Sequence, residues 1–343
     1  MANSTEERIA EILRLRQGYG DQVLLLAHHY QRPEVVAVAD HIGDSYQLAK
    51  VAAESSAPKV LFCGVSFMGE SAAILAKEGT SVYLPEPTAG CPMADMADPA
   101  DVASMLRRLA QLMPHRRVLP VTYVNSTAAV KAVTGEAGGI VCTSANAKAA
   151  LSWALGQSDA VLFLPDQMLA RNSARELGVA PVVSLDPFGP MPPQEALEQA
   201  RVLVWNGYCH VHTWFSTAHV AAARERFPRA RILVHPESPE EVVLASDGSG
   251  STNYLSQQVK EGNPGDIFVI GTEVNLVRRL ASTYSDRTVV PLTSSLCPNM
   301  YKITLGSVQR LLEEWPESHK VVVPPEVASW ARFALERMLA LKV

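Results

Sequence analysis

Three cysteines in this chain follow short apolar stretches, an arrangement that could place three thiols in one site. Cys209 comes after the apolar run at 202–205 and a glycine, within the stretch RVLVWNGYCHVH. Cys91 ends the stretch SVYLPEPTAGC, and Cys297 ends VVPLTSSLC. Parallel α/β sheets carry their chemistry at the carboxyl ends of the strands. We therefore expect the three cysteines to meet in one shared site.

Thiolates at strand ends are suited to binding a soft metal. Zinc and iron–sulfur clusters both use such ligands, although the chain has no Cys-x-x-Cys spacing. Three cysteines without a fourth leave one coordination position for water or substrate, as in catalytic zinc sites. A [4Fe–4S] cluster held by three cysteines would likewise present one iron as a Lewis acid. Cys63 and Cys142 lie inside apolar runs and are expected to be core residues.

The pair His210 and His212 leaves a second metal chemistry open. Its H-x-H spacing resembles that of metal-dependent amidohydrolases, in which two histidines on alternate strand positions bind one metal. A zinc or iron hydrolase that uses His210, His212 and His235 as ligands is therefore an alternative. A non-catalytic iron–sulfur or redox-sensing protein is another, but it gives no role to the polar residues at the other strand ends.

Titratable and amide side chains follow other apolar runs. One run ends in His28, His29 and Tyr30, another in Tyr123 and Asn125, and a third in His235 and Glu237. A single histidine at a strand end is usually structural, but side chains of this kind at three equivalent ends indicate a common pocket.

Serine and threonine residues precede three predicted helices, in the turns Gly43-Asp44-Ser45, Thr143-Ser144 and Gly250-Ser251-Thr252. Such residues cap helix N-termini, where free N–H groups and the helix dipole also favour bound anions. Three such ends facing one cavity would suit a substrate with several negative charges. The chain has no Walker or dinucleotide-binding glycine pattern, so ATP or NAD binding by those routes is not supported.

Short apolar runs alternate with Ala-rich helical stretches, which predicts an α/β fold. The runs form three similar units, each with polar residues after its first strand, a Ser/Thr turn, two further strands and a cysteine. Repetition at this scale is typical of duplicated supersecondary units. Helices are predicted at 45–54, 71–77, 145–155, 195–201 and 303–315, and a first helix is capped by Asn3 or Ser4. A last helix opens at Pro324 and Pro325, and the whole segment after Cys297 is expected to pack on the first unit.

Composition and length exclude several classes of protein. A chain of 343 residues is too long for one ordinary core, so two or three domains are expected. The net charge is −5 and no dense basic run occurs, which argues against nucleic acid as a partner. No stretch approaches the ~18 consecutive apolar residues of a membrane span. Five scattered cysteines favour a reducing cytosol over a disulfide framework, so a cytoplasmic protein is expected.

Together these stretches resemble the quinolinate synthase family along nearly the whole chain. The motifs are AHHYQRPEV, FCGVSFMGESAAIL, PEPTAGCPMADM, TYVNSTAAVKA, VCTSANA, FLPD, WNGYCHVH, HPESPEEV, GSGST, IGTE and CPNMYKITL. The resemblance implies three similar small α/β domains with parallel sheets around a pseudo-threefold axis, and an active site at their central junction. The implied domains are residues 1–95 with 298–343, residues 96–210, and residues 211–297. It also implies one [4Fe–4S] cluster held by Cys91, Cys209 and Cys297.

The activity implied by the resemblance is condensation of iminoaspartate with dihydroxyacetone phosphate, which gives quinolinate, phosphate and water in de novo NAD biosynthesis. An open iron of the cluster would act as Lewis acid. An aspartate oxidase or dehydrogenase would have to supply the iminoaspartate. The chain departs from the usual family pattern in two places: Tyr301 stands where many relatives carry lysine, and the stretch around Arg171 and Asn172 is looser.

The resemblance further implies roles for the side chains that match the motifs. Substrate carboxylates would be held by His28, Ser45, His235, Ser251 and Thr252, and the triose-derived portion would be positioned by Tyr123, Asn125 and Ser144. Isomerisation, imine formation and dehydration each need an acid and a base. Tyr30 and Glu237 are expected to transfer these protons, Tyr123 also belongs to the catalytic set, and His212 would act beside the cluster.

Overall fold

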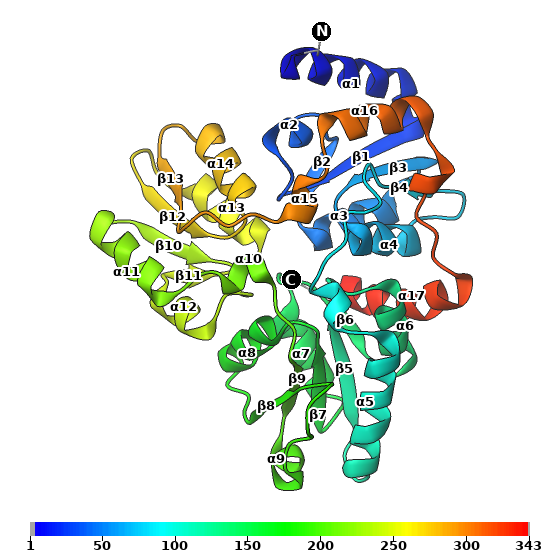
Figure 1. The fold of residues 1–343 in the computed structure, drawn as a ribbon, viewed down its shortest axis with the longest axis vertical. Helices are drawn as coiled ribbons and strands as arrows, with labels where there is room; N and C mark the ends of the chain where they lie inside the picture. Colours follow the sequence, from blue (N-terminus) through cyan, green and yellow to red (C-terminus); the bar gives the residue numbers. More distant parts are fainter. Residues whose placement is uncertain (1–3, 342–343) are drawn as a thin grey trace.

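The computed structural model describes residues 4–341, which contain three separate parallel β-sheets of four, five and four strands (Figure 1). The sheets lie around a common centre. The helical turns α10 (His210–Thr213) and α15 (Pro298–Tyr301), which begin after two of the cysteines, are near that centre. The predicted α/β class with three parallel sheets is confirmed.

The strands follow one order in all three sheets. That order is β2–β1–β3–β4 in the first unit, β6–β5–β7–β9 in the second and β11–β10–β12–β13 in the third. The second sheet adds β8 at its edge. The strands are β1 (Val23–His28), β2 (His41–Gly43), β3 (Lys59–Cys63), β4 (Ser81–Tyr83), β5 (Val118–Tyr123), β6 (Ile140–Cys142), β7 (Ala160–Leu164), β8 (Val182–Leu185), β9 (Val202–Trp205), β10 (Arg231–Val234), β11 (Gly248–Ser249), β12 (Ile267–Gly271) and β13 (Thr288–Pro291). The strand that leads to a cysteine (β4, β9 or β13) therefore has the same position in every sheet, as expected for duplicated units.

Strand β8 and helix α9 (Gln194–Gln199) form an insertion in the second unit. They lie between α8 (Gln167–Glu176) and β9, where the other two units pass directly from helix to strand. Strand β8 was not predicted, because its residues are mostly half-buried and form no continuous apolar run.

Helices cover both faces of the sheets. Every residue of the central strand β7 is buried, as expected for a parallel sheet between two helical layers. In the first unit the helices are α1 (Thr5–Tyr19), η1 (Gly20–Gln22), α2 (Pro33–Val36), α3 (Ser45–Glu54), α4 (Ser66–Leu75) and η2 (Ala94–Met96). Helices α5 (Pro99–Leu112), α6 (Ala128–Glu136), α7 (Ala147–Leu155), α8 and α9 belong to the second unit, and α10, α11 (Thr217–Arg226), α12 (Glu240–Ala245), α13 (Thr252–Glu261) and α14 (Val274–Thr283) to the third.

Local signals explain where several helices begin. Ser4 caps α1 in a reciprocal capping box with Glu7, whereas Asn3 lies outside the described residues. Helix α3 has the predicted bounds and begins with a capping box between Asp44 and Gln47. Helix α4 begins five residues before its predicted start, since its N-cap Val65 provides no capping side chain that a sequence could reveal.

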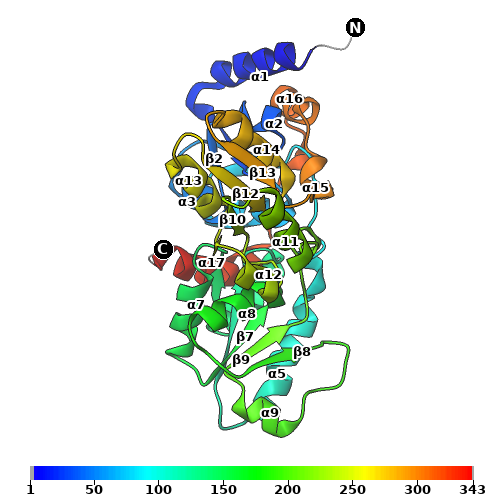
Figure 2. The same ribbon diagram turned by 90° about the vertical axis from the view of Figure 1, so that its left-hand side faces the viewer.

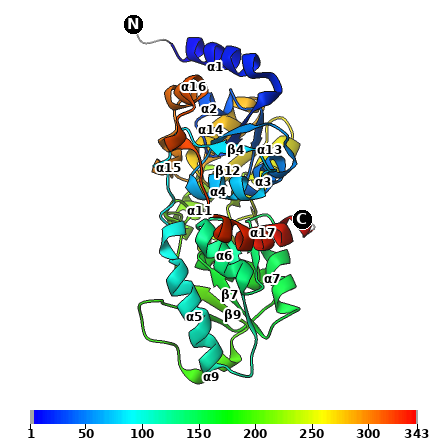
Figure 3. The ribbon, with the colours of Figure 1, turned by 90° about the vertical axis from the view of Figure 1, so that its right-hand side faces the viewer.

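The C-terminal segment joins the first and second units. It contains α15, α16 (Leu305–Glu314), η3 (Glu317–His319) and α17 (Pro325–Ala340). Helix α16 packs on α1, as predicted, but α17 lies mainly on α6 and also contacts α4 (Figure 3). Helices α17 and α6 can approach this closely because residue 135 in α6 is glycine. A Cβ at that position would overlap the carbonyl oxygen of Trp330.

The molecule is extended along one axis. Helices α1 and α9 lie at its opposite ends, and the third unit lies beside the first (Figures 1 and 2). The proposed domain boundaries near residues 95 and 210 fall between the strands of successive sheets, and the one near 297 follows the last strand, β13. Among residues 4–341, no helix has the length and apolar character needed to cross a membrane.

Candidate active site

One cavity at the junction of the three units brings together nearly all the side chains predicted to do chemistry. Its lining includes His28, Tyr30, Ser45, Cys91, Tyr123, Asn125, Ser144, Cys209, His212, His235, Glu237, Thr252 and Cys297. Two predicted residues lie outside this lining. His29 is buried elsewhere and accepts from the guanidinium of Arg279 at 2.8 Å. Ser251 lines a neighbouring pocket that shares Ser144 with the central cavity. Its hydroxyl accepts from the N–H of Tyr254 and so caps α13.

The Ser/Thr turns lie at helix starts but do not all cap them in the predicted way. Asp44 rather than Ser45 caps α3, and Ser251 caps α13. The N-cap of α7 is Asn146, whose side-chain oxygen accepts from the backbone N–H of Thr143 instead of from the helix. Ser45, Ser144 and Thr252 are thus left to face the cavity.

Each cysteine loop is tied to the start of a neighbouring helix by the same backbone hydrogen bond. The first N–H of α4, α8 or α14 donates to the carbonyl oxygen two residues before the cysteine, at 2.8, 3.0 and 2.8 Å. The donors are Ser66, Gln167 and Val274, and the acceptors are Ala89, Gly207 and Ser295. The three loops therefore enter the cavity with equivalent backbone geometry.

Each cysteine also begins a helical turn. Its carbonyl oxygen accepts from the N–H four residues later, in Asp95, Thr213 or Tyr301, at 3.1, 3.0 and 3.1 Å. Backbone N–H groups inside these turns lower the thiol pKa; they belong to Met93, Ala94, Val211, Asn299 and Met300. N–H donors at a helix start favour a thiolate.

Burial opposes ionisation of the three thiols. It raises the pKa of Cys91 to about 12, and it raises the pKa of Cys209 and Cys297 as well. The charges of neighbouring groups add to this effect: Cys297 raises the pKa of Cys91, and Cys91 raises that of Cys209. A bound cation would stabilise the thiolates and displace their protons. Three half-buried thiols that line one cavity, each at the start of a helical turn, therefore fit a metal centre.

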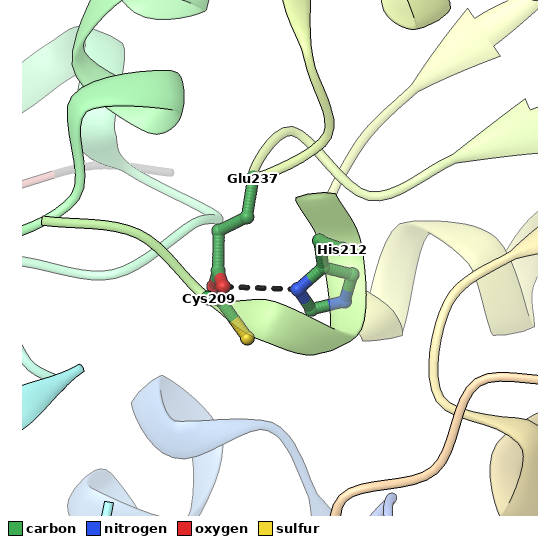
Figure 4. Close-up of side chains that lie close together, drawn as sticks. All are labelled: Cys209, His212 and Glu237. Carbon is green, nitrogen blue, oxygen red and sulfur yellow. Dashed lines mark hydrogen bonds and ion pairs between the residues drawn. The ribbon is translucent and has the colours of Figure 1, made fainter. Parts of the chain in front are cut away.

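Glu237 is the central residue of a buried hydrogen-bond network and lies beside Cys209 and His212 (Figure 4). Its carboxylate accepts from the hydroxyl of Tyr123 at 2.5 Å and from Nδ1 of His212 at 2.9 Å. Burial by itself raises the pKa of Glu237, but His212 and His235 and the hydrogen bonds from His212 and Tyr123 lower it to about 2. Glu237 is therefore a carboxylate at neutral pH, which can only accept, so His212 must carry its proton on Nδ1.

The network continues from His212 to Tyr30. Nε2 of His212 is 3.2 Å from both the Tyr30 hydroxyl and Oγ1 of Thr272, and these two oxygens are 2.7 Å apart. Burial and the charge of Glu237 hold the pKa of Tyr30 well above its usual value. Tyr30 thus keeps its proton, and Tyr30, His212 and Glu237 form a chain along which a proton can move.

Two further histidines in the cavity are neutral. Burial, reinforced by the charge of Arg279, lowers the pKa of His28 to about 3. Burial and the neighbouring His212 lower the pKa of His235 to about 3, and the His235 ring stacks on that of His212 at 4.3 Å. Each neutral ring has one N–H donor and one acceptor.

The three histidines of the hydrolase alternative do not form a free ligand set. His210 is exposed, and both ring nitrogens of His212 already lie within hydrogen-bonding distance of protein groups. A different trio, Cys209, His212 and Glu237, has its potential ligand atoms within 4.8 Å of one another. Glu237 and His212 are already paired in that trio.

The family is settled by comparison with known proteins. A family model described as quinolinate synthetase A protein matches residues 10–340. The chain belongs to the quinolinate synthase family. It is 43% identical to the quinolinate synthase of Acidobacterium capsulatum, over 99% of this chain and 94% of that protein. The quinolinate synthase of Corynebacterium glutamicum is 42% identical, over 98% of this chain and 88% of its own length.

Several buried residues that were not predicted hold the site residues in place through hydrogen bonds and helix caps. Thr272 bonds both Tyr30 and His212. Asp166 and Glu273 cap α8 and α14, and Glu273 also accepts from the backbone N–H of Cys297 at 3.5 Å. A signal was available, because FLPD and IGTE each place a carboxyl two residues after the end of a buried third strand.

Lys131 is a second unpredicted group near the cavity. It is fully buried in α6, its ammonium donates to the carbonyl oxygen of Ser126 at 2.5 Å, and it lies 5.5 Å from the centre of the Phe67 ring. Burial lowers the pKa of Lys131 to about 8, although Glu70 and Cys91 act in the opposite direction. No local pattern in the sequence distinguishes this lysine from a surface residue.

Proposed function

We propose that this chain is a quinolinate synthase that condenses iminoaspartate with dihydroxyacetone phosphate, giving quinolinate, phosphate and water in de novo NAD biosynthesis. Membership of the family supports the activity. The observation that carries the proposal is the central cavity, in which three equivalent cysteine turns meet one buried network of acid and base groups.

Cys91, Cys209 and Cys297 are proposed to hold a [4Fe–4S] cluster. The donor set fits this group, because three thiols line one cavity and each begins an equivalent helical turn. When bound, such a cluster would supply Lewis acidity at the iron that no cysteine holds. All five cysteines are free thiols, which supports the proposed cytoplasmic location, a reducing compartment.

The remaining residues are proposed to bind and orient an anionic substrate. His28 and His235 are neutral, so each can donate one N–H to a substrate carboxylate. Ser45 and Thr252 lie at the starts of α3 and α13, where helix dipoles favour negative charge. Ser251, one residue before Thr252, would support this site from the neighbouring pocket. Asn125, Ser144 and Tyr123 would position the triose-derived portion from the second unit.

Proton transfer is proposed to run through Glu237, His212 and Tyr30. The Glu237 carboxylate can accept a proton, and Tyr30 can donate one because its hydroxyl remains protonated. His212 bonds both and could relay between them. Tyr123 would adjust the basicity of Glu237 through their direct hydrogen bond.

An anaerobic assay tests the proposed function. The purified chain is mixed with dihydroxyacetone phosphate while L-aspartate and an L-aspartate oxidase or dehydrogenase generate iminoaspartate, and quinolinate is measured by chromatography. The proposal predicts quinolinate only when the chain, the iminoaspartate source and the triose phosphate are all present. Iron-loaded protein that forms no quinolinate under these conditions would contradict it.

A further inference from the structure

Asn172 links the second unit to the loop that carries Glu237. It lies on α8, its side chain is only 1% exposed, and Nδ2 donates to the carbonyl oxygens of Pro236 at 2.8 Å and Ser238 at 2.9 Å. These two carbonyls belong to the residues on either side of Glu237. One buried amide therefore holds the backbone on both sides of the network's central carboxylate.

The orientation of this amide is fixed by its partners. A carbonyl oxygen can only accept, so the NH2 group of Asn172 must face Pro236 and Ser238. Its Oδ1 is buried and has no hydrogen-bond partner among the described residues. An amide whose oxygen has no partner while both N–H groups are used indicates that this position requires donors.

The helix that carries Asn172 is itself anchored to a cysteine loop. The N–H of Gln167, the first residue of α8, donates to Gly207, two residues before Cys209. Asp166 caps the same helix by accepting from Leu169 at 2.6 Å. Helix α8 therefore connects the Cys209 turn at one point with the Glu237 loop at another.

The loop that carries Glu237 lies between β10 and α12. It turns sharply after β10, where the N–H of Ser238 donates to the carbonyl oxygen of His235 at 3.0 Å. The Glu237 side chain contacts Tyr123 of the second unit and His212 of the third. A shift of the backbone at Pro236 or Ser238 would move the carboxylate away from both.

We propose that Asn172 is a positioning residue that fixes Glu237 relative to the Cys209 turn. The proposal rests on the proposed function only in assigning Glu237 to proton transfer. The two N–H donors of Asn172 hold the loop at Pro236 and Ser238 across the boundary between the second and third units. We call this pair of hydrogen bonds the clamp. Loss of the clamp lowers turnover through Glu237 and leaves the metal centre in place.

The test compares Asn172→Ala with Arg171→Ala, a matched control on the same helix whose side chain bonds Ser184 of the inserted strand instead. Because a displacement of about 1 Å in an active site can cost on the order of 10²-fold, Asn172→Ala should lower kcat about 10- to 100-fold with little change in KM. Its iron content and cluster absorption should match those of Arg171→Ala. Asn172→Ser, which keeps one short donor, serves if the alanine variant does not fold.

A double-mutant cycle with Glu237→Gln separates positioning from general stability. If Asn172 acts through Glu237, adding Asn172→Ala to Glu237→Gln causes little further loss of kcat. Losses that multiply in the double variant would overturn the proposal, as would a kcat equal to that of Arg171→Ala.

Hydrogen exchange gives a readout that needs no activity. Amide exchange over residues 235–238 should become faster in Asn172→Ala but not in Arg171→Ala. Unchanged exchange there would also overturn the clamp. An inactive wild-type chain that still shows the exchange difference would contradict the proposed function and leave the clamp supported.

Discussion

The three units are alike where they carry the cysteines but differ at the ends of their first strands. The cysteine ends are nearly identical: each loop is tied at the same position to the first N–H of a helix, and each cysteine begins a helical turn. The ends of the first strands share only their location, since they carry His28 and Tyr30, Tyr123 and Asn125, or His235 and Glu237.

This difference matches the symmetry of what each set is proposed to hold. Three equivalent backbone turns suit a ligand that presents three equivalent positions, as three irons of a cubic cluster do. A substrate with different groups at its two ends requires different side chains around it. Duplication of one unit provides the first property, and divergence of side chains at the first-strand ends provides the second.

The largest expected effect comes from replacing any one of the three equivalent cysteines. Cys91→Ala, Cys209→Ala and Cys297→Ala should each lose the cluster and all activity, because two thiolates leave the cluster without its third ligand. Cys63→Ala is the control, since Cys63 is buried in β3 away from the cavity lining. Iron and sulfide determination on anaerobically purified variants makes the measurement, and native iron content in any of the three would disprove the equivalence.

Replacing a side chain at the end of a first strand should lower turnover without changing the amount of bound iron. Glu237→Gln keeps the shape of the side chain but removes the base, so kcat should fall by about 10²- to 10⁴-fold while iron content stays native. Glu240→Gln, on α12, is the matched control and should keep wild-type turnover. The comparison fails if Glu237→Gln loses iron as the cysteine variants do.

Cluster assembly on the apo chain should become more favourable as pH rises. Burial raises the pKa of all three cysteines, so the thiols are protonated at neutral pH and must release their protons to bind iron. The assembly constant should rise about tenfold per pH unit for each proton released. Competition with an iron chelator, corrected for the chelator's own titration, measures this slope. A slope of zero would show that the thiols are already ionised.

The smallest expected effect comes from removing one hydrogen bond between two residues at the first-strand ends. Tyr123→Phe removes the hydrogen bond to the Glu237 carboxylate. A bond to a charged group is worth about 1.5–3 kcal/mol, so kcat should fall roughly 10- to 150-fold, less than in Glu237→Gln. Tyr284→Phe, outside the cavity lining, is the control. A kcat for Tyr123→Phe below that of Glu237→Gln would require a role for Tyr123 beyond supporting Glu237.

The parts of the molecule that the sequence predicts well are those with a local signal. Buried strands appear as apolar runs, and each of the three cysteines follows such a run, so the sheets and the common cavity could be predicted. Strand β8 has no such signal because it is half-buried at a sheet edge. Helix α17 shows an apolar face in the sequence, but its partner α6 is decided by close approach at Gly135, far away in the chain.

Contacts between units explain what could not be predicted in the site. Thr272 completes the network although it is 242 positions from Tyr30 and 60 from His212. Lys131 and Asn172 are polar residues inside helices, where surface positions usually carry such side chains. Their burial follows from the packing of whole units against one another, which no local spacing records.

The most direct test of the central claim is the iron and sulfide content of the wild-type chain purified without oxygen. We expect a brown protein with about four iron and four sulfide per chain, which bleaches in air and loses activity as it does so. A colourless anaerobic preparation that still forms quinolinate would contradict the assignment of Cys91, Cys209 and Cys297 to a [4Fe–4S] cluster.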